Sequence, residues 1–140
     1  MPSYSRLTLQ KLAESKLDDA KLLFAHGRCS NAYYLGGYSV ELGLKAALTR
    51  QIGGETLPDR RFVNDAYTHK PDELVRLAGL LPAIRAELDS NANFASNWGI
   101  VSGWEEGSRY ESVDPFKASA FMSALLEPEN GVSQWVRRHW

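Results

Sequence analysis

The fold is decided by residues 31–51, which read Asn-Ala-Tyr-Tyr-Leu-Gly-Gly-Tyr-Ser-Val-Glu-Leu-Gly-Leu-Lys-Ala-Ala-Leu-Thr-Arg-Gln. The apolar residues of this stretch do not form one stripe, because on a helix they point in several directions. A helix that is apolar nearly all round has to be surrounded by other elements. We therefore expect residues 32–51 to form a buried central helix, capped by Ser30 or Asn31 and ended by the glycine pair that follows.

The same helix carries a line of small residues at spacings of three and four, namely Ala32, Gly36, Ser39, Gly43 and Ala47. A glycine inside a helix costs roughly 1 kcal/mol relative to alanine. Two glycines on one line therefore indicate that something packs closely there. We expect another backbone to approach along this line, either that of the preceding helix or that of a second copy of the protein.

Helical spacing of apolar residues also dominates the rest of the sequence, and no long run alternates apolar and polar residues as a strand would. Residues 8–26 form one amphipathic helix, which Gly27 ends with a left-handed cap. The further helices expected are 71–80 after a Thr68 cap, 82 to about 101, one that starts at Pro115 after Asp114, and 132–140 after an interruption at Pro128.

Residues 55–70 are expected to be irregular, because Pro58, Asp59 and Asn64 discourage regular structure. A loop of this length in a compact domain is often functional. Taken together, the elements predict an all-α fold. They form a single domain over residues 1–140, an antiparallel bundle of four to five helices around the buried second helix.

The composition narrows the classes of function. The 16 basic and 17 acidic residues give a net charge of −1, so any contact with nucleic acid needs a local patch. Cys29 is the only cysteine, which excludes an intramolecular disulfide and a cysteine-rich zinc site. The first residues, Met-Pro-Ser-Tyr-Ser-Arg, do not resemble a signal peptide, and the apolar runs are too short for a membrane span. We expect a cytoplasmic protein without a membrane partner.

No metal site and no cofactor are expected. His26, His69 and His139 lie far apart and form no metal-binding pair, so we expect each to be solvated or locally hydrogen-bonded. Gly36 and Gly37 lie inside a helix, and the later glycine pair lacks the strand and the lysine of a phosphate loop. No serine stands in the sequence context of a nucleophile elbow.

Two features carry chemistry, and the first is the polar line Tyr34, Tyr38, Glu41 and Lys45 on one face of the central helix. Glu41 precedes Lys45 by four residues, which is the favourable order for an ion pair within a helix. This face is either a partly buried network whose polar groups pair with one another or the floor of a cleft.

The second feature is residues 104–111, which read Trp-Glu-Glu-Gly-Ser-Arg-Tyr-Glu. Arg109 beside Tyr110 and Trp104 suits stacking on a base and pairing with a phosphate. The alternative is that Arg109 pairs with Glu41 or another acid while the aromatic rings pack in the core. The basic and aromatic residues 135–140 are most simply the last turn of an amphipathic helix.

Three segments together resemble the HEPN superfamily (higher eukaryotes and prokaryotes nucleotide-binding domains). Residues 34–48 resemble its second helix, in which a Glu-x-x-x-Lys pair is followed by small and aliphatic residues. His69-Lys-Pro-Asp-Glu-Leu resembles the family's His-x-x-x-x-Leu segment before a short helix. Ser108-Arg109-Tyr110 resembles its Ala-Arg-Tyr step before the last long helix. The three segments follow in the family's order and span most of the chain.

The resemblance implies a bundle of four or five helices, often a homodimer. It also implies partners such as minimal nucleotidyltransferases in toxin–antitoxin pairs, or roles in RNA cleavage. The family's RNases resemble one another in an Arg, four to six residues, His motif that meets its copy across the dimer. This chain departs from the motif, because no histidine follows Arg109 at that spacing. Arg61 and His69 are too far apart, and the C-terminal arginines stand too close to His139.

The resulting hypothesis is a HEPN-like homodimeric module that is not an active nuclease and that binds a nucleotide, RNA or a partner protein. Two alternatives remain open: an RNase that uses Arg109 or His69 in a non-standard way, and a purely structural interaction subunit. The cleft of the leading hypothesis is lined by Tyr38, Glu41, Lys45, Trp104, Arg109 and Tyr110.

Overall fold

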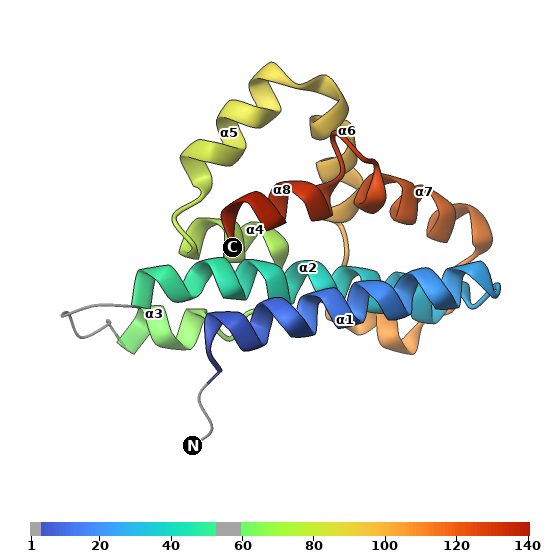
Figure 1. The fold of residues 1–140 in the computed structure, drawn as a ribbon, viewed down its shortest axis with the longest axis horizontal. Helices are drawn as coiled ribbons and strands as arrows, with labels where there is room; N and C mark the ends of the chain where they lie inside the picture. The colour runs from blue at the N-terminus through green and yellow to red at the C-terminus, as the bar shows by residue number, and fades with distance from the viewer. Residues whose placement is uncertain (1–3, 53–59) are drawn as a thin grey trace.

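The computed structural model describes residues 4–52 and 60–140, and over these residues the chain is all-helical without a strand (Figure 1). The all-α fold class predicted from the sequence is confirmed, although the helices in these ranges outnumber the expected four to five. Among the described helices, none combines the length and the apolar character needed to cross a membrane. The elements are α1 (Arg6–Ala25), α2 (Cys29–Ile52), α3 (Arg60–Asp65), α4 (Pro71–Leu77), α5 (Leu81–Ser90), α6 (Ala92–Val101), the 3-10 helix η1 (Glu106–Tyr110), α7 (Pro115–Leu126) and α8 (Val132–His139).

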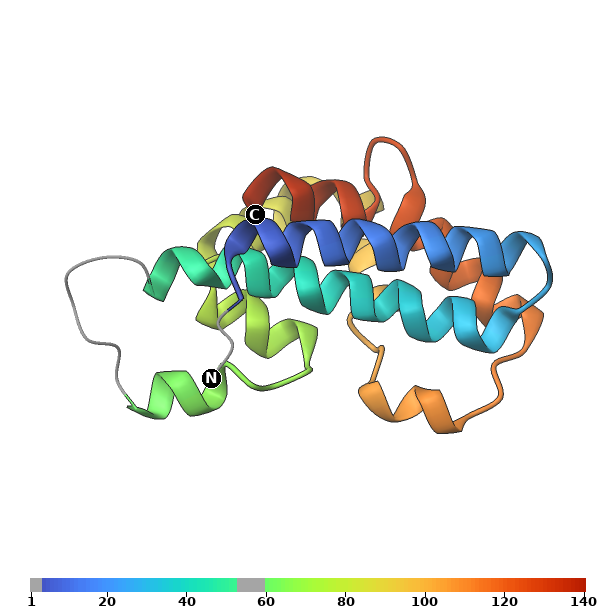
Figure 2. The ribbon, with the colours of Figure 1, turned by 60° about the horizontal axis from the view of Figure 1, so that its bottom comes forward.

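The helices α1 and α2 run antiparallel and lie side by side (Figures 1 and 2). α1 begins earlier than the expected residue 8, because Ser5 caps it by accepting a hydrogen bond from Thr8 N at 3.1 Å. The turn that follows α1 contains Gly27 with a φ of +73°, which confirms the predicted left-handed stop. α1 buries a single apolar stripe, made of Leu9, Ala13, Leu17 and Ala20.

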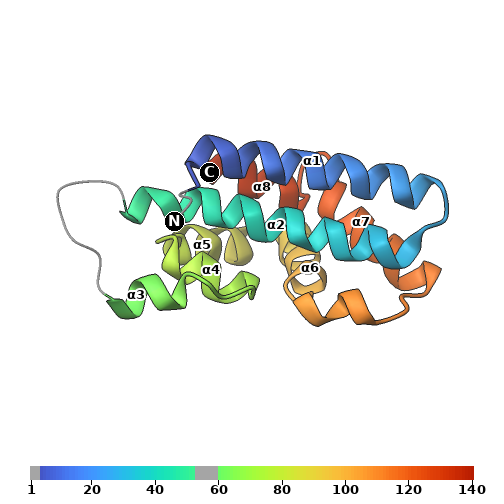
Figure 3. The same cartoon turned by 90° about the horizontal axis from the view of Figure 1, so that it is seen from below.

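α2 is the buried central helix of the fold, as predicted. Thirteen of its 24 residues are buried, and it packs against α1, α4, η1, α7 and α8. Figure 3 shows it between α1 on one side and α3, α4 and η1 on the other. α2 begins before both expected caps, because Ser30 Oγ instead accepts a hydrogen bond from Val113 N at 2.8 Å. The glycine pair that was expected to end it, Gly53 and Gly54, lies outside the described residues.

Two of the small residues of α2, Gly36 and Gly43, make room for bulky side chains of neighbouring helices and not for a neighbouring backbone. A Cβ added to Gly36 would lie 3.0 Å from Phe121 Cε1 and 3.1 Å from Leu125 Cδ2, both on α7. A Cβ added to Gly43 would lie 2.6 Å from Val136 Cγ1 on α8. The expected approach of the first helix's backbone or of a second copy is therefore wrong at these glycines, because side chains of α7 and α8 fill the space.

The long helix expected after Pro82 is two helices, α5 and α6, which meet at Asn91 (Figure 1). Asn91 Oδ1 accepts a hydrogen bond from Phe94 N at 3.1 Å and so caps α6. Asn91 Nδ2 donates to Asn130 Oδ1 at 2.7 Å, which ties this corner to the segment between α7 and α8. Apolar residues recur on both sides of the corner, so periodicity alone did not reveal the break.

Most of the other helix boundaries lie at residues that ordinarily begin or end a helix. α7 begins after Asp114, which accepts a hydrogen bond from Lys117 N at 2.8 Å, and α8 begins beyond Pro128, both as predicted. Thr68 does not cap α4, whose N-cap is Lys70. Residues 60–65 form α3 instead of the expected irregular segment, and the preceding residues 55–59 lie outside the described part of the chain.

Candidate functional site

One face of α2 carries the four polar side chains that were predicted to share it. The rings of Tyr34 and Tyr38 meet edge to face with centroids 6.0 Å apart. Glu41 Oε2 lies 3.4 Å from Lys45 Nζ, so the ion pair expected from their spacing is present. Glu41 is only 3% exposed, whereas the Lys45 side chain keeps 20% exposure. The carboxylate is therefore buried, while its cationic partner reaches the surface.

A second partner of Glu41 comes from a distant part of the chain. His69, in the segment between α3 and α4, has its Nδ1 2.8 Å from Glu41 Oε1. A buried carboxylate needs hydrogen-bond partners, and the imidazole supplies one. The His69 side chain keeps 44% exposure, as expected of a solvated histidine, but its hydrogen-bond partner lies 28 residues away in sequence, on α2.

η1 continues the network on the other side of the imidazole. His69 Nε2 lies 3.1 Å from Glu106 Oε2, and Glu106 Oε1 lies 3.3 Å from Arg109 Nη1. Arg109 therefore pairs with an acid of its own element and not with Glu41. Nothing in the sequence distinguishes Glu106 from the acidic residues beside it, so it was not predicted. We call Lys45, Glu41, His69, Glu106 and Arg109 the ionic network.

A cleft of about 340 Å³ opens beside the ionic network. It is lined by Thr68, His69, Lys70, Glu105 and Glu106. None of the six residues expected to line a cleft is among these five. The structure thus brings the predicted residues of α2 and η1 together through His69, while the walls of the cleft come from neighbours that the sequence did not single out.

Aromatic rings and cations follow one another from η1 across α2 to α1. The guanidinium Cζ of Arg109 lies 4.8 Å from the ring centroid of Tyr110. On α1, Lys16 Nζ lies 6.0 Å from the ring centroid of Tyr38. Tyr34 lies beside both pairs, since its ring meets that of Tyr38 and its side chain acts on the guanidinium of Arg109 strongly enough to raise the pKa of Arg109. We call Tyr110, Arg109, Tyr34, Tyr38 and Lys16 the aromatic–cation row.

Exposure and ionisation differ along the row. Tyr110 is 80% exposed, whereas Tyr34 and Tyr38 are half-buried. Hydrogen bonds with Tyr110 and Tyr34 raise the pKa of Arg109, so its guanidinium stays charged at physiological pH. Burial raises the pKa of Tyr38, and the nearby charge of Glu41 adds to the rise, so the Tyr38 hydroxyl stays protonated at neutral pH.

Trp104 is not available to a ligand, contrary to the expectation from the sequence. Its side chain is 1% exposed and lies against Tyr34, with ring centroids 6.1 Å apart. Gly37 of α2 makes room for it, because a Cβ at Gly37 would overlap the indole ring. Trp104 therefore supports the row from the core.

The ionic network is not arranged as a metal centre. The two carboxylates that contact His69 lie at opposite ring nitrogens, so Glu41 and Glu106 do not converge with the imidazole on one point. Within residues 4–52 and 60–140, no group of three or more histidine, cysteine, aspartate or glutamate residues is placed to hold a metal ion.

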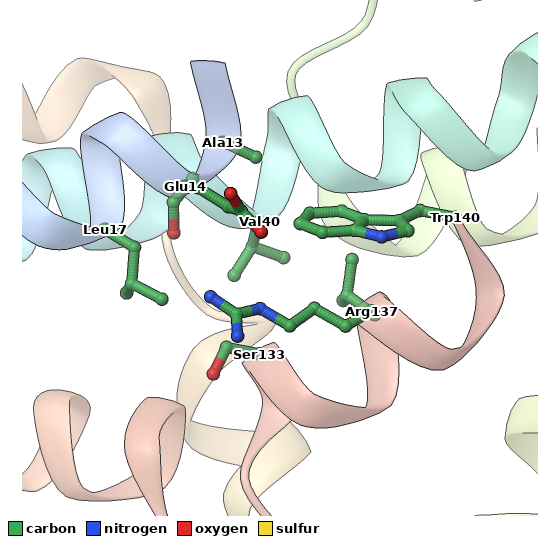
Figure 4. Close-up of a pocket in the computed structure, with 9 residues that line it drawn as sticks. Ala13, Glu14, Leu17, Val40, Ser133, Arg137 and Trp140 are labelled. Carbon is green, nitrogen blue, oxygen red and sulfur yellow. The ribbon is translucent and has the colours of Figure 1, made fainter. Parts of the chain in front are cut away.

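A smaller hollow lies between α1, α2 and α8 (Figure 4). Its volume of about 10 Å³ is enough for roughly one water molecule and not for an organic ligand. Figure 4 shows Arg137 reaching from α8 alongside Val40 and Ser133. Arg137 is exposed while Trp135 and Val136 are buried, which matches the amphipathic last helix that we expected.

Comparisons with protein-family models, with curated proteins and with solved structures found no match to this chain.

Proposed function

We propose that the protein is a HEPN-like helical module that binds single-stranded RNA or a nucleotide along the aromatic–cation row. The observation that carries this proposal is the alternation of aromatic rings with Lys16 and Arg109 on neighbouring elements. Bases stack on aromatic side chains, and phosphates pair with adjacent cations, whatever the base sequence. With a net charge of −1, the protein offers such a ligand no global attraction, so a local row of this kind is required.

The ionic network supports the HEPN-like part of the proposal. The resemblance rests on three segments that are far apart in sequence, and one residue of each belongs to the network: Glu41, His69 and Arg109. The contacts run through Glu106, which connects His69 to Arg109.

In this proposal the module acts as a homodimer, and a minimal nucleotidyltransferase is a candidate partner. Sedimentation velocity of the purified protein tests whether it is a homodimer. A monomer at micromolar concentration contradicts this part of the proposal.

The test of ligand binding is fluorescence anisotropy with a labelled oligouridine of about ten nucleotides, since single-strand sites span about this length. Tyr110→Ala removes an exposed stacking ring, and we expect binding to weaken about five- to a hundredfold. Arg109→Ala is expected to weaken binding as well. The matched control is Phe116→Ala, because Phe116 is an 89% exposed aromatic residue on α7, outside the row. Equal effects at Tyr110 and Phe116, or no binding by the unsubstituted protein, contradict the proposal.

RNA cleavage is the second candidate function, and one specific contact favours it. A carboxylate that holds one imidazole nitrogen leaves the other nitrogen for proton transfer, and Glu41 holds His69 Nδ1 at 2.8 Å. However, Glu106 occupies the other nitrogen at 3.1 Å. We therefore place this function second, because His69 can take a proton from a ribose hydroxyl only after Glu106 moves away.

A cleavage assay separates the two functions. Under the binding proposal, labelled RNA stays intact with the purified protein and with His69→Gln and Arg109→Ala variants. Cleavage by the unsubstituted protein that His69→Gln abolishes, while RNA binding is kept, would replace the binding proposal by the RNase.

A further inference from the structure

The segment that carries Arg109 and Tyr110 is attached at both ends to the core. Trp104, just before it, is 1% exposed and packs at Gly37. Val113, just after it, is 7% exposed and donates its backbone N–H to Ser30 Oγ at 2.8 Å. Residues 105–112 between these anchors contain η1, and we call them the strap.

The strap itself is held less firmly than its ends. Its turn hydrogen bonds are internal, such as Ser108 N to Glu105 O at 3.0 Å. Its buried hydroxyl, Ser108 Oγ, has no hydrogen-bond partner among the described residues, which disfavours the closed position. Glu106 holds the strap to His69, and the guanidinium of Arg109 lies near the Tyr34 side chain, which raises the pKa of Arg109. Because the strap gains little from burial, these side-chain contacts decide its position.

The contact between Glu106 and His69 depends on the protonation of the imidazole. A protonated imidazole has two N–H donors and can donate a hydrogen bond to Glu41 and another to Glu106 at the same time. A neutral imidazole has one N–H donor, so one carboxylate then faces a nitrogen lone pair. Glu41 is buried and loses more if it is left unpaired, so the proton stays on Nδ1. The lone pair of Nε2 then faces the Glu106 carboxylate and repels it.

We propose that His69 is a proton-operated latch of the strap, which holds η1 closed when the imidazole is protonated and releases it when the imidazole is neutral. Histidine is the side chain whose charge ordinarily changes near neutral pH. The charged groups in contact with the His69 ring are Glu41 of α2 and Glu106 of the strap. Lys45 and Arg109 pair with these two carboxylates, and Glu105 and Lys70 line the same cleft. Each carboxylate that contacts the ring thus has a cation of its own, and the proton of the imidazole decides whether both carboxylates find an N–H donor on His69.

The latch has a consequence that rests on the proposed function. A closed strap places Arg109 and Tyr110 beside Tyr34 and so completes the aromatic–cation row. A released strap takes these two side chains away from the half of the row on α2 and α1. RNA binding then weakens when the imidazole of His69 loses its proton.

The closing experiment measures the strap without any ligand, by hydrogen exchange of its backbone amides on the full chain, corrected for intrinsic exchange. Protection of residues 106–111 is expected to fall about fivefold between about pH 5.5 and about pH 8. The midpoint should coincide with the NMR titration of the His69 ring and not with that of His26 or His139.

The Glu106→Gln variant provides the decisive comparison. The amide of Gln donates to a neutral Nε2 and accepts from a protonated one, so the strap should stay closed at both pH values. His26→Gln, which alters an exposed histidine at the end of α1, should keep the full pH dependence. Protection that does not change with pH in the unsubstituted protein, or that changes equally in Glu106→Gln, overturns the latch. Because no RNA is present, a protein that fails to bind RNA leaves this result unaffected.

Discussion

At the scale of single residues, Gly37 is the position where the core comes closest to the candidate site. It faces the indole of Trp104, which in turn lies against Tyr34 of the aromatic–cation row. Because glycine has no side chain, Gly37 leaves room for the large indole ring of Trp104 beneath the row. The position of the row depends on this one close contact, although Gly37 itself is not part of the row.

Gly37→Ala is expected to destabilise the protein by about 1–3 kcal/mol, because the new methyl group overlaps a buried and rigid ring. The matched control is Gly99→Ala, since an added Cβ on Gly99 of α6 meets no atom within 4 Å. That substitution should stabilise the helix by about 0.5–1 kcal/mol. Urea unfolding of both variants checks this pair, and equal free energies of unfolding contradict it.

His139 gives the stability a defined pH dependence. Burial lowers the pKa of His139, and the positive charges of Arg138 and Arg50 lower it further. The unfolded chain therefore binds this proton more readily than the folded protein does. The stability that the neutral ring contributes is complete above about pH 6.5, the ordinary value for histidine, and is lost as the pH falls through the lowered folded-state value.

The measurement is the free energy of unfolding at about pH 5 and about pH 7.5, on either side of the ordinary histidine pKa. We expect His139→Gln to lose less stability on acidification than the unsubstituted protein. His26→Gln serves as the control, because His26 is exposed and should leave the difference between the two pH values unchanged. A steeper acid loss in His139→Gln has the wrong sign and would refute the assignment.

From the sequence, only those contacts of the site could be predicted that lie within one face of a single helix. Glu41 and Lys45 stand four residues apart, and their pairing follows from helix geometry. His69 joins Glu41 from 28 residues away, and periodicity holds no information about that contact. Glu106 is one of several acids near Arg109, and only the three-dimensional path of the strap selects it.

At the scale of elements, the corner at Asn91 explains why the helix count was too low. Glycine and proline signals marked the C-terminal end of α1 and the starts of α7 and α8, and these boundaries were predicted. Asn91 is a weaker signal, because asparagine also occurs inside helices and the apolar spacing continues beyond it. Its three partners make the corner: Phe94 N, Asn130 Oδ1 and Glu87 Oε1.

Asn91→Ala removes the cap of α6 and the bridge to Asn130, so we expect a loss of about 1–2 kcal/mol of stability. Asn93→Ala alters an exposed residue in the first turn of the same helix and should stay within about 0.5 kcal/mol of the unsubstituted protein. Thermal and urea unfolding measure both variants. If Asn93→Ala costs as much as Asn91→Ala, the corner is not held by the Asn91 side chain.

At the scale of the whole molecule, a net charge of −1 limits how the proposed RNA binding should respond to salt. Each phosphate that a single strand pairs with a cation lowers the logarithm of affinity by about 0.7 per tenfold rise in salt. The aromatic–cation row offers two cations, Lys16 and Arg109, so we expect a slope of about −1.4. A strongly basic protein would show a much steeper slope.

Arg109→Gln should reduce that slope by about 0.7, because one ion pair with phosphate is lost. Arg85→Gln is the control, since Arg85 is exposed on α5, an element that contributes no residue to the row. Anisotropy titrations over a range of potassium chloride concentrations provide the slopes. A slope that Arg109→Gln leaves unchanged contradicts a phosphate contact at Arg109.

The position of α2 also sets the order in which the protein has to be assembled. α1 and α2 are joined by a short turn, so their contact closes early and at small entropic cost. α7 and α8, which cover other sides of α2, are synthesised much later. Until they return, a nascent chain carries a long helix that is apolar nearly all round, and such surface is prone to aggregation. The helix that organises the finished bundle is thus the part of the growing chain that most needs protection during translation.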